Sequence, residues 1–243
     1  MATRQLLGEL AFTHEWYKSF LTHLKEEEYS FETFPGTLEQ KTILLRHDVD
    51  LSLSDALTMA KIEAEVGVES TYCIFIASPL YNPFDGENLQ KIHEIQSLGH
   101  DIALHFSTHN YWPNEQPSKG AVETQVNNMM DVLRAVTPEI SEAVSFHRPP
   151  DWALETEFET FINTYSPQYF SDISYISESN QRWRTDQPDF ENLPERMQIL
   201  VHPGLWSHRD DEFEKRLEQG VVNSCRYVNR RAQEEFIEPN KEN

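Results

Sequence analysis

The sequence predicts a single α/β domain with parallel strands, arranged as a closed or nearly closed barrel. Short apolar runs alternate with amphipathic segments of helical length, and strands that alternate with helices pair in parallel through crossover connections. Polar residues of chemical interest repeatedly follow an apolar run, which is where the active-site loops of a β/α barrel lie. With 243 residues, the chain is long enough to bury a full core.

Each predicted strand is a short apolar run bounded by polar or turn-forming residues. The first leads into His47-Asp48-Val49-Asp50, and the third, which follows Gly99, leads into two histidines. The predicted strands comprise residues 42–45, 71–76, 101–104, 143–146, 169–175 and 198–201.

The predicted helices carry apolar residues three and four positions apart. The second is capped by Ser52 or Ser54 and ends at Gly67. The predicted helices comprise approximately residues 12–24, 53–64, 87–98, 122–136, 154–162 and 208–236. We therefore expect an N-terminal helical segment over residues 1–40 that packs on the barrel, the barrel over residues 41–237, and a disordered tail over residues 238–243.

The composition restricts the partners. The formal net charge is −21, from 41 acidic against 20 basic residues, which argues against nucleic acid or an anionic membrane as a partner. No segment has the apolar length of a membrane span, and the N-terminus lacks the basic and apolar regions of a signal peptide. Cys73 and Cys225 lie far apart and do not indicate a disulfide framework. We expect a cytoplasmic protein, and the sequence leaves its oligomeric state open.

Two histidines and two carboxylates at predicted strand ends indicate a metal site. His105 and His109 share a face if the loop after their strand makes one helical turn. Together with a carboxylate from Asp48 or Asp50 they make an open three-ligand site, which leaves a position for water as a hydrolase requires. We expect one divalent ion, zinc by preference, with cobalt, nickel and iron as alternatives.

The acidic pair suggests a division of roles. One carboxylate would bind the ion and the other would take a proton from the bound water; a shared cation allows Asp48 and Asp50 to ionise together. Alternatively, one of them caps the helix that begins near Ser52.

Two later strand ends contribute further candidates. Arg148, in Phe146-His147-Arg148-Pro149-Pro150, would pair with a carboxylate and hold it ionised, or else form a surface salt bridge. His202 would act as a general acid, since its unperturbed pKa lies near neutrality, or else pack beside Trp206. Asp172 lies in a segment that can form a pocket wall.

These motifs, taken in order, resemble the polysaccharide deacetylase (NodB-homology) family, carbohydrate esterase family four. The resemblance covers the acidic pair, Gly-His-Asp-Ile-x-x-His-x-x-x-His, Arg-Pro-Pro and Leu-x-His, between about Thr42 and Trp206. It implies a (β/α) barrel of about seven parallel strands that removes an N- or O-acetyl group from a sugar by metal-assisted hydrolysis.

The resemblance also implies roles for individual residues. His105 and His109 match metal ligands, and Asp48 and Asp50 match the base and the carboxylate ligand. Arg148 matches the partner of the base, His202 the acid, and Leu200 a wall of the acetyl pocket; we add Trp206 and Asp172 as substrate-binding candidates.

The chain departs from the family pattern in the acidic pair, which Val49 separates. The roles of Asp48 and Asp50 can therefore be reversed, and His47 can join the metal. We expect an acetylated sugar or glycan precursor as substrate; the alternatives are a small non-sugar amide, or a binding protein that lacks turnover.

Overall fold

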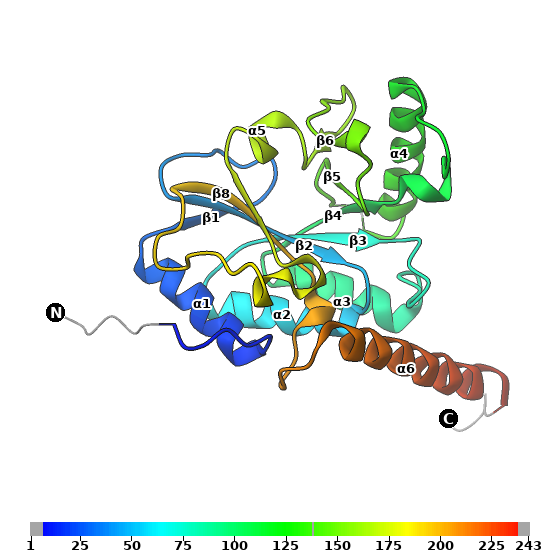
Figure 1. Cartoon of the computed structure of the whole chain (residues 1–243). Helices are drawn as coiled ribbons and strands as arrows, with labels where there is room; N and C mark the ends of the chain where they lie inside the picture. Colours follow the sequence, from blue (N-terminus) through cyan, green and yellow to red (C-terminus); the bar gives the residue numbers. More distant parts are fainter. Residues whose placement is uncertain (1–6, 138, 238–243) are drawn as a thin grey trace.

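The computed structural model describes residues 7–137 and 139–237, and these form one parallel sheet with helices around it (Figure 1). The strand order is β6-β5-β4-β3-β2-β8-β7, and β1 pairs in parallel with the beginning of β2. The strands are β1 Ser30–Glu32, β2 Thr42–Val49, β3 Thr71–Phe75, β4 Asp101–Phe106, β5 Ala143–Phe146, β6 Ile162–Asn163, β7 Ser174–Ser177 and β8 Arg196–Val201.

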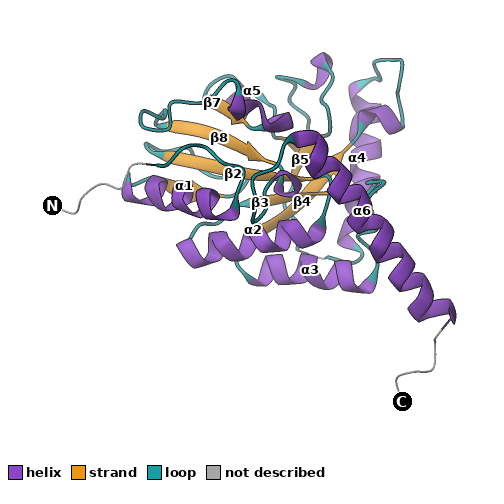
Figure 2. Ribbon diagram, turned by 60° about the horizontal axis from the view of Figure 1, so that its bottom comes forward, coloured by secondary structure: helices purple, strands orange, loops and turns teal. Residues whose placement is uncertain are grey.

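Three helices cover one side of the sheet, and the last long helix extends away from the body (Figure 2). The covering helices are α1 His14–Glu26, α2 Leu53–Val66 and α3 Gly86–Ser97. The others are α4 Lys119–Arg134, the short α5 Pro167–Phe170 and the extending α6 Phe213–Ala232. Among the described residues, no helix combines the length and apolar character needed to cross a membrane.

The predicted fold class is confirmed: seven strands form a continuous parallel path with flanking helices. The path is a curled half-barrel rather than a closed barrel, because no described pairing joins its edge strands β6 and β7. The cap of α2 is Ser52, whose hydroxyl accepts a hydrogen bond from the Asp55 amide. Gly67 ends this helix in the left-handed conformation, with φ 74°.

The predicted helix over residues 154–162 is wrong. This stretch is a loop between the short helix η2, Asp151–Ala153, and β6. Its apolar spacing arises because Phe158 and Phe161 stack on each other, with ring centroids 4.5 Å apart, and both contact Phe146. The Asn163 amide donates to the Ala153 carbonyl and holds the loop closed.

The N-terminal part and the seventh strand also differ in detail from the expectation. Residues 7–40 contain α1 and, in addition, the unpredicted strand β1. The strand expected over residues 169–175 starts later, at Ser174, because Pro167–Phe170 forms a helical turn. The tail expected over residues 238–243 lies outside the described residues.

Alternation along β2 separates two sets of buried polar groups. Leu45 and His47 face the helices, whereas Arg46 and Asp48 face the inside of the curled sheet. Asp50, two residues beyond Asp48, follows on the inner side at the carboxyl end of the strand. The inner face of β2 therefore carries the Arg46 guanidinium and the Asp48 carboxylate, and the Asp50 carboxylate follows at the carboxyl end of the strand.

The helix-facing side holds a buried carboxylate, Glu63 of α2. It accepts hydrogen bonds from Tyr17 (2.5 Å), Ser70 (2.6 Å) and Tyr72 (3.0 Å), and lies 2.6 Å from Nε2 of His47. Burial would raise the pKa of Glu63, but His47 and these hydrogen bonds outweigh it and lower the pKa to about 2. The network joins α1, α2 and β2 behind the site.

Candidate metal centre and active site

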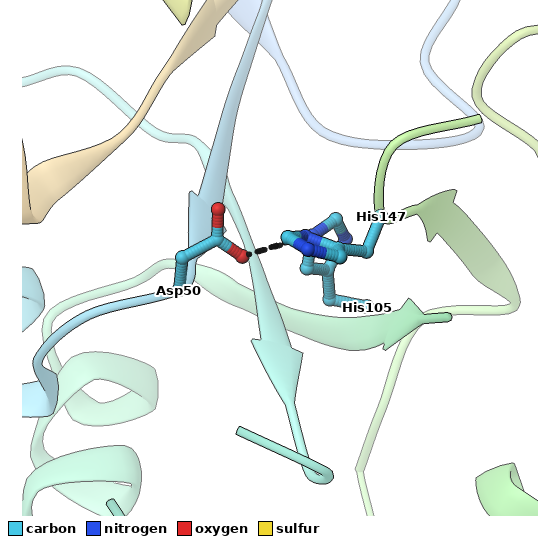
Figure 3. A group of neighbouring side chains, drawn as sticks. All are labelled: Asp50, His105 and His147. Carbon is cyan, nitrogen blue, oxygen red and sulfur yellow. Dashed lines mark hydrogen bonds and ion pairs between the residues drawn. The ribbon is translucent and has the colours of Figure 1, made fainter. Parts of the chain in front are cut away.

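Three side chains meet at the carboxyl ends of neighbouring strands (Figure 3). Asp50 directly follows β2, His105 is the fifth residue of β4, and His147 directly follows β5. Oδ1 of Asp50 lies 3.1 Å from Nε2 of His105 and 3.2 Å from Nδ1 of His147. The two ring nitrogens lie 3.2 Å apart. One carboxylate oxygen and two imidazole nitrogens thus form a nearly equilateral triangle.

The surroundings of the triangle fit a divalent cation. Nδ1 of His105 lies 3.0 Å from the Ser145 carbonyl, which accepts its proton, so Nε2 is the ring nitrogen available to bind an ion. Oδ1 of Asp50 is buried and has no hydrogen bond of acceptable geometry, although both histidines approach it. Atoms bound to one zinc ion at about 2.0–2.2 Å each lie about 3–3.5 Å from one another. Asp50, His105 and His147 therefore form a donor set that fits such an ion.

The charge of Asp50 is stabilised by its neighbours. Burial would raise the pKa of this carboxyl, but interactions with His105 and His147 and the charge of His202 outweigh burial and hold its pKa well below the usual range. Asp50 is thus ionised and able to act as a ligand at neutral pH.

Asp48 is 2% exposed and is held by a different set of partners. Its Oδ1 lies 3.2 Å from Nε of Arg46, and its Oδ2 accepts hydrogen bonds from Arg46 (3.2 Å) and from the Ser145 hydroxyl (2.9 Å). Burial would raise the pKa of Asp48, but Arg46 and His105 outweigh burial and lower it. Asp48 is therefore an ionised carboxylate beside the metal triangle whose orientation is fixed.

Arg46 is completely buried, and every side of its guanidinium has a partner. It donates to the Thr164 hydroxyl (2.6 Å), the Gln198 side-chain carbonyl (2.7 Å) and the Tyr165 hydroxyl (2.8 Å). The guanidinium also lies 4.7 Å from the centre of the Tyr165 ring. The arginine that neutralises Asp48 is thus built into the core on the same strand.

On the other side of the mouth, His202 follows β8 and is paired with buried Glu178. Nδ1 of His202 lies 3.2 Å from Oε2 of Glu178, and the His202 backbone amide also donates to Glu178. Nε2 lies 4.0 Å from Oδ2 of Asp50. Burial would lower the pKa of His202, but Glu178 outweighs it and, with Asp50 and Asp48, raises the pKa to about 9. His202 is therefore protonated at neutral pH, with Nε2 directed toward the carboxylates.

His109 does not join the metal triangle, although the sequence predicts it as a ligand. The expected helical turn does not form, since His105 is still in β4, Ser107 is extended and η1, Thr108–Asn110, is a 3-10 helix. His109 is consequently exposed, and its Nε2 lies 3.1 Å from the Arg148 carbonyl. His147 occupies the position expected for it.

Arg148 does not pair with Asp48, because Arg46 already fills that place. Its side chain is exposed and has no carboxylate partner among the residues that the structure describes. Asp172 is also exposed, after α5, and does not line the pocket that contains the triangle. His47 faces the opposite side of β2, bound to Glu63, and is not near the metal triangle.

Of the two remaining substrate-binding candidates, Leu200 lies in the pocket and Trp206 does not. Leu200 lines the pocket, whereas Trp206 is buried behind it and donates to Glu178 over 3.4 Å. Trp206 therefore supports the Glu178–His202 pair instead of contacting a ligand directly.

Three functional candidates escape the sequence reasoning: Arg46, His147 and Glu178. His147 follows the strand at 143–146 as Asp50 follows β2, and Arg46 shares a strand face with Asp48, so strand position indicates both. Glu178 follows β7, whose position the sequence predicts incorrectly, and no local pattern marks it.

The metal triangle opens into a pocket of about 350 Å³. Asp48, Asp50, His105, His147 and His202 lie together in its wall. The rest of the lining is largely apolar and includes Phe146, Tyr165, Leu200, Leu205, Phe213 and Leu217. A cavity with apolar walls and a few converging polar groups is typical of a small-molecule site.

No protein-family model and no curated protein sequence matches the chain. Among solved structures, a peptidoglycan deacetylase from Bacillus subtilis matches 84% of this chain and 98% of its own, at 12% identity and a TM-score of 0.47. A chitin deacetylase from the fungal pathogen Colletotrichum lindemuthianum matches 79% of this chain and 85% of its own, at 11% identity and a TM-score of 0.43.

A pseudoenzyme of carbohydrate esterase family 4 from Bacillus anthracis matches 79% of this chain, at 13% identity and a TM-score of 0.45. The chain spans 63% of the length of that pseudoenzyme. Of these three structures, the pseudoenzyme is named as a member of carbohydrate esterase family 4, and the similarity of this chain to each of them is one of fold alone.

Proposed function

We propose that the protein is a metal-dependent hydrolase that removes an acetyl group from an acetylated sugar. The observation that carries this proposal is the arrangement in one pocket of a three-donor metal triangle, a second carboxylate, Asp48, and a histidine, His202. Hydrolysis of an amide requires activation of water, polarisation of the carbonyl and protonation of the leaving nitrogen. Asp48 and His202 would serve the first and third requirements, and an ion held by the metal triangle would serve the second.

The ion would be held by Asp50, His105 and His147. When bound, a divalent cation supplies Lewis acidity that polarises the acetyl carbonyl and lowers the pKa of a water molecule. Zinc suits one carboxylate and two imidazoles, and cobalt, nickel and iron suit them nearly as well.

Asp48 would act as the general base. Arg46 and Ser145 occupy part of its carboxylate and fix its orientation, while the residue still lines the pocket. The low pKa of Asp48 keeps the carboxylate ionised and able to accept a proton from the attacking water.

His202 would act as the general acid. Glu178 holds Nδ1, which leaves the Nε2 proton directed across the pocket toward the acidic pair. An amine leaves an acetamide only after its nitrogen has been protonated, and an imidazolium in this position can donate that proton. Leu200, in the pocket wall, would contact the acetyl methyl group.

The proposed function is tested by acetate release. Protein loaded with zinc, cobalt or nickel is incubated with N-acetylhexosamines, short N-acetylated oligosaccharides and N-acetylated amino acids. Acetate from the sugars supports the proposal. Release from the amino acids alone would indicate a non-sugar amide as substrate, and no release from either class would contradict hydrolysis.

The roles of the two aspartates can be separated by substitution. Asp48→Asn should keep the metal and lower kcat by about 10²–10⁴, because it removes a base and not a ligand. Asp50→Asn should lose the metal. Elemental analysis and acetate release measure the two effects, and Asp131→Asn on exposed α4 is the matched control. Loss of the metal from Asp48→Asn and its retention by Asp50→Asn would instead make Asp48 the ligand and Asp50 the base.

His202→Ala should lower kcat on an acetamide by about 10²–10⁴ with unchanged metal content. An activated acetate ester should be affected much less, because its leaving group departs without a proton. His93→Ala, on the outer surface of α3, controls for the loss of an imidazole. Equal losses on the amide and on the ester would exclude the general-acid role.

A further inference from the structure

Arg148 is a charged residue that lines the pocket, and the proposed chemistry gives it no role. It lines the same cavity as the metal triangle, and its side chain is exposed. The acidic groups of the site already have partners: Asp48 pairs with Arg46, Asp50 with the two histidines, and Glu178 with His202. The guanidinium therefore has no carboxylate partner among the described residues.

Arg148 is one of several described arginines without a carboxylate partner, and it is the one that lines the pocket of the metal triangle. The chain carries 41 acidic against 20 basic residues, so a guanidinium has many carboxylates with which to pair. On the surface of α6, for example, Arg230 and Arg231 each contact carboxylates within 3.2 Å. The N–H donors of the Arg148 guanidinium are instead available to a ligand in the pocket.

The backbone holds Arg148 in this position at a conformational cost. Its φ is 48°, in the left-handed region that residues with a side chain rarely adopt. The His109 ring lies 3.1 Å from its carbonyl oxygen, and Pro149 and Pro150 stiffen the chain that follows. Strained residues persist where the surroundings determine them and cluster at ligand sites.

The pocket lining also includes a polar residue of another segment, Asn180. It is exposed and also has a positive φ, 56°. Its side-chain amide offers two N–H donors, and a guanidinium offers five in a planar fork that matches carboxylate and phosphate oxygens. An anionic group within reach of both residues would accept hydrogen bonds from each.

We propose that Arg148 binds an anionic group, a phosphate or a carboxylate, carried by the acetylated sugar. This inference rests on the proposed function, because it assigns the substrate class of the same pocket. The acetyl group would lie at the metal triangle beside Leu200, and the anion at the rim. The cavity of about 350 Å³ is at the small end of ligand pockets, which suits one sugar unit with its charged group.

Binding tests the inference without requiring turnover. Calorimetry on zinc-loaded protein compares N-acetylglucosamine, which is uncharged, with N-acetylglucosamine 1-phosphate and with N-acetylmuramic acid, which carries a carboxylate. At least one charged ligand should bind about 10- to 100-fold more tightly than the uncharged one, the range expected for hydrogen bonds to a charged group. The preferred ligand distinguishes phosphate from carboxylate.

Substitution connects the preference to the residue. Arg148→Gln should abolish the advantage of the charged ligand, and Arg148→Lys should restore only part of it, because an ammonium lacks the planar fork. Arg226→Gln on exposed α6 removes the same charge away from the pocket and should keep the advantage. Equal affinity for charged and uncharged sugars, no binding of either, or an equal loss in both Gln variants would overturn the inference.

The outcomes also separate this inference from the proposed function. Tight binding of a charged sugar that depends on Arg148, without release of acetate, would uphold the anion site and contradict hydrolysis. Release of acetate with no preference for charged sugars would uphold hydrolysis and contradict the anion site.

Discussion

Replacing His147 by alanine should remove the bound metal and with it the hydrolytic activity. His147 contributes one of three donor atoms, and two remaining ligands cannot hold an ion against competing water as three do. We expect metal affinity to fall at least 100-fold, since even loss of a partner behind a ligand costs 10- to 100-fold. Elemental analysis after dialysis measures this directly.

His109→Ala is the matched control, because it removes an imidazole from the residue that the sequence motif favours as ligand. Its ring is exposed and contacts only the Arg148 carbonyl, so the variant should keep one equivalent of metal. His105→Ala should behave like His147→Ala. Retention of metal by His147→Ala together with loss from His109→Ala would show that the loop after β4 rearranges when the ion binds, and would overturn the triangle.

Replacing Arg46 by methionine should lower the free energy of unfolding by about 3–5 kcal/mol, the cost of leaving a buried charge without its partner. Arg46 is completely buried, and among the described residues Asp48 has no other cation within ion-pair distance except the His105 ring at 3.8 Å. The substitution also leaves Thr164 and Gln198 without their donor. Denaturation by urea, at constant m-value, measures the effect.

A second variant shows whether the charge causes this loss. Adding Asp48→Asn to Arg46→Met removes the uncompensated carboxylate, so the double variant should regain about 0.5–3 kcal/mol relative to additive single effects. Arg134→Met, which breaks an exposed pair with Glu142 on the outer surface, should cost no more than about 1 kcal/mol. Strict additivity of the Arg46 and Asp48 substitutions would mean that the pair is not coupled.

The sheet was largely predictable because each of its central strands contains a short apolar run. β2, β3, β4 and β8 are buried on both faces, and apolar runs of this kind are typical of such strands in parallel sheets. The edges were harder to predict. β6 has two residues, and the aromatic spacing of the loop before it imitates a helix although the rings stack on one another.

The site was predictable in so far as it depends on strand ends. Asp48, Asp50, His105 and His202 all follow from the positions of three strands. The choice between His109 and His147 depends on how the chain turns after β4, which residue spacing does not determine.

Arg46 and Glu178, which are the partners of Asp48 and His202, were not predictable. Arg46 belongs to no recognised motif, and the sequence predicted that Arg148 would pair with the carboxylate. Glu178 comes from a segment whose strand starts elsewhere than expected, and it meets His202 only through the pairing of β7 with β8. Contacts between strands distant in sequence decide both cases.

The two polar networks on opposite faces of β2 also bear on how the chain avoids mispairing. If β2 slipped by one residue against β3 and β8, every side chain would change faces. Arg46 and Asp48 would then be pressed against α2, while His47 would leave Glu63 for the pocket. Each displaced charge would be buried without a partner, so the slipped alignment is strongly disfavoured. If β2 were entirely apolar, a slip of one residue would cost much less free energy. Such a chain could fold in the slipped alignment and lose the proposed chemistry.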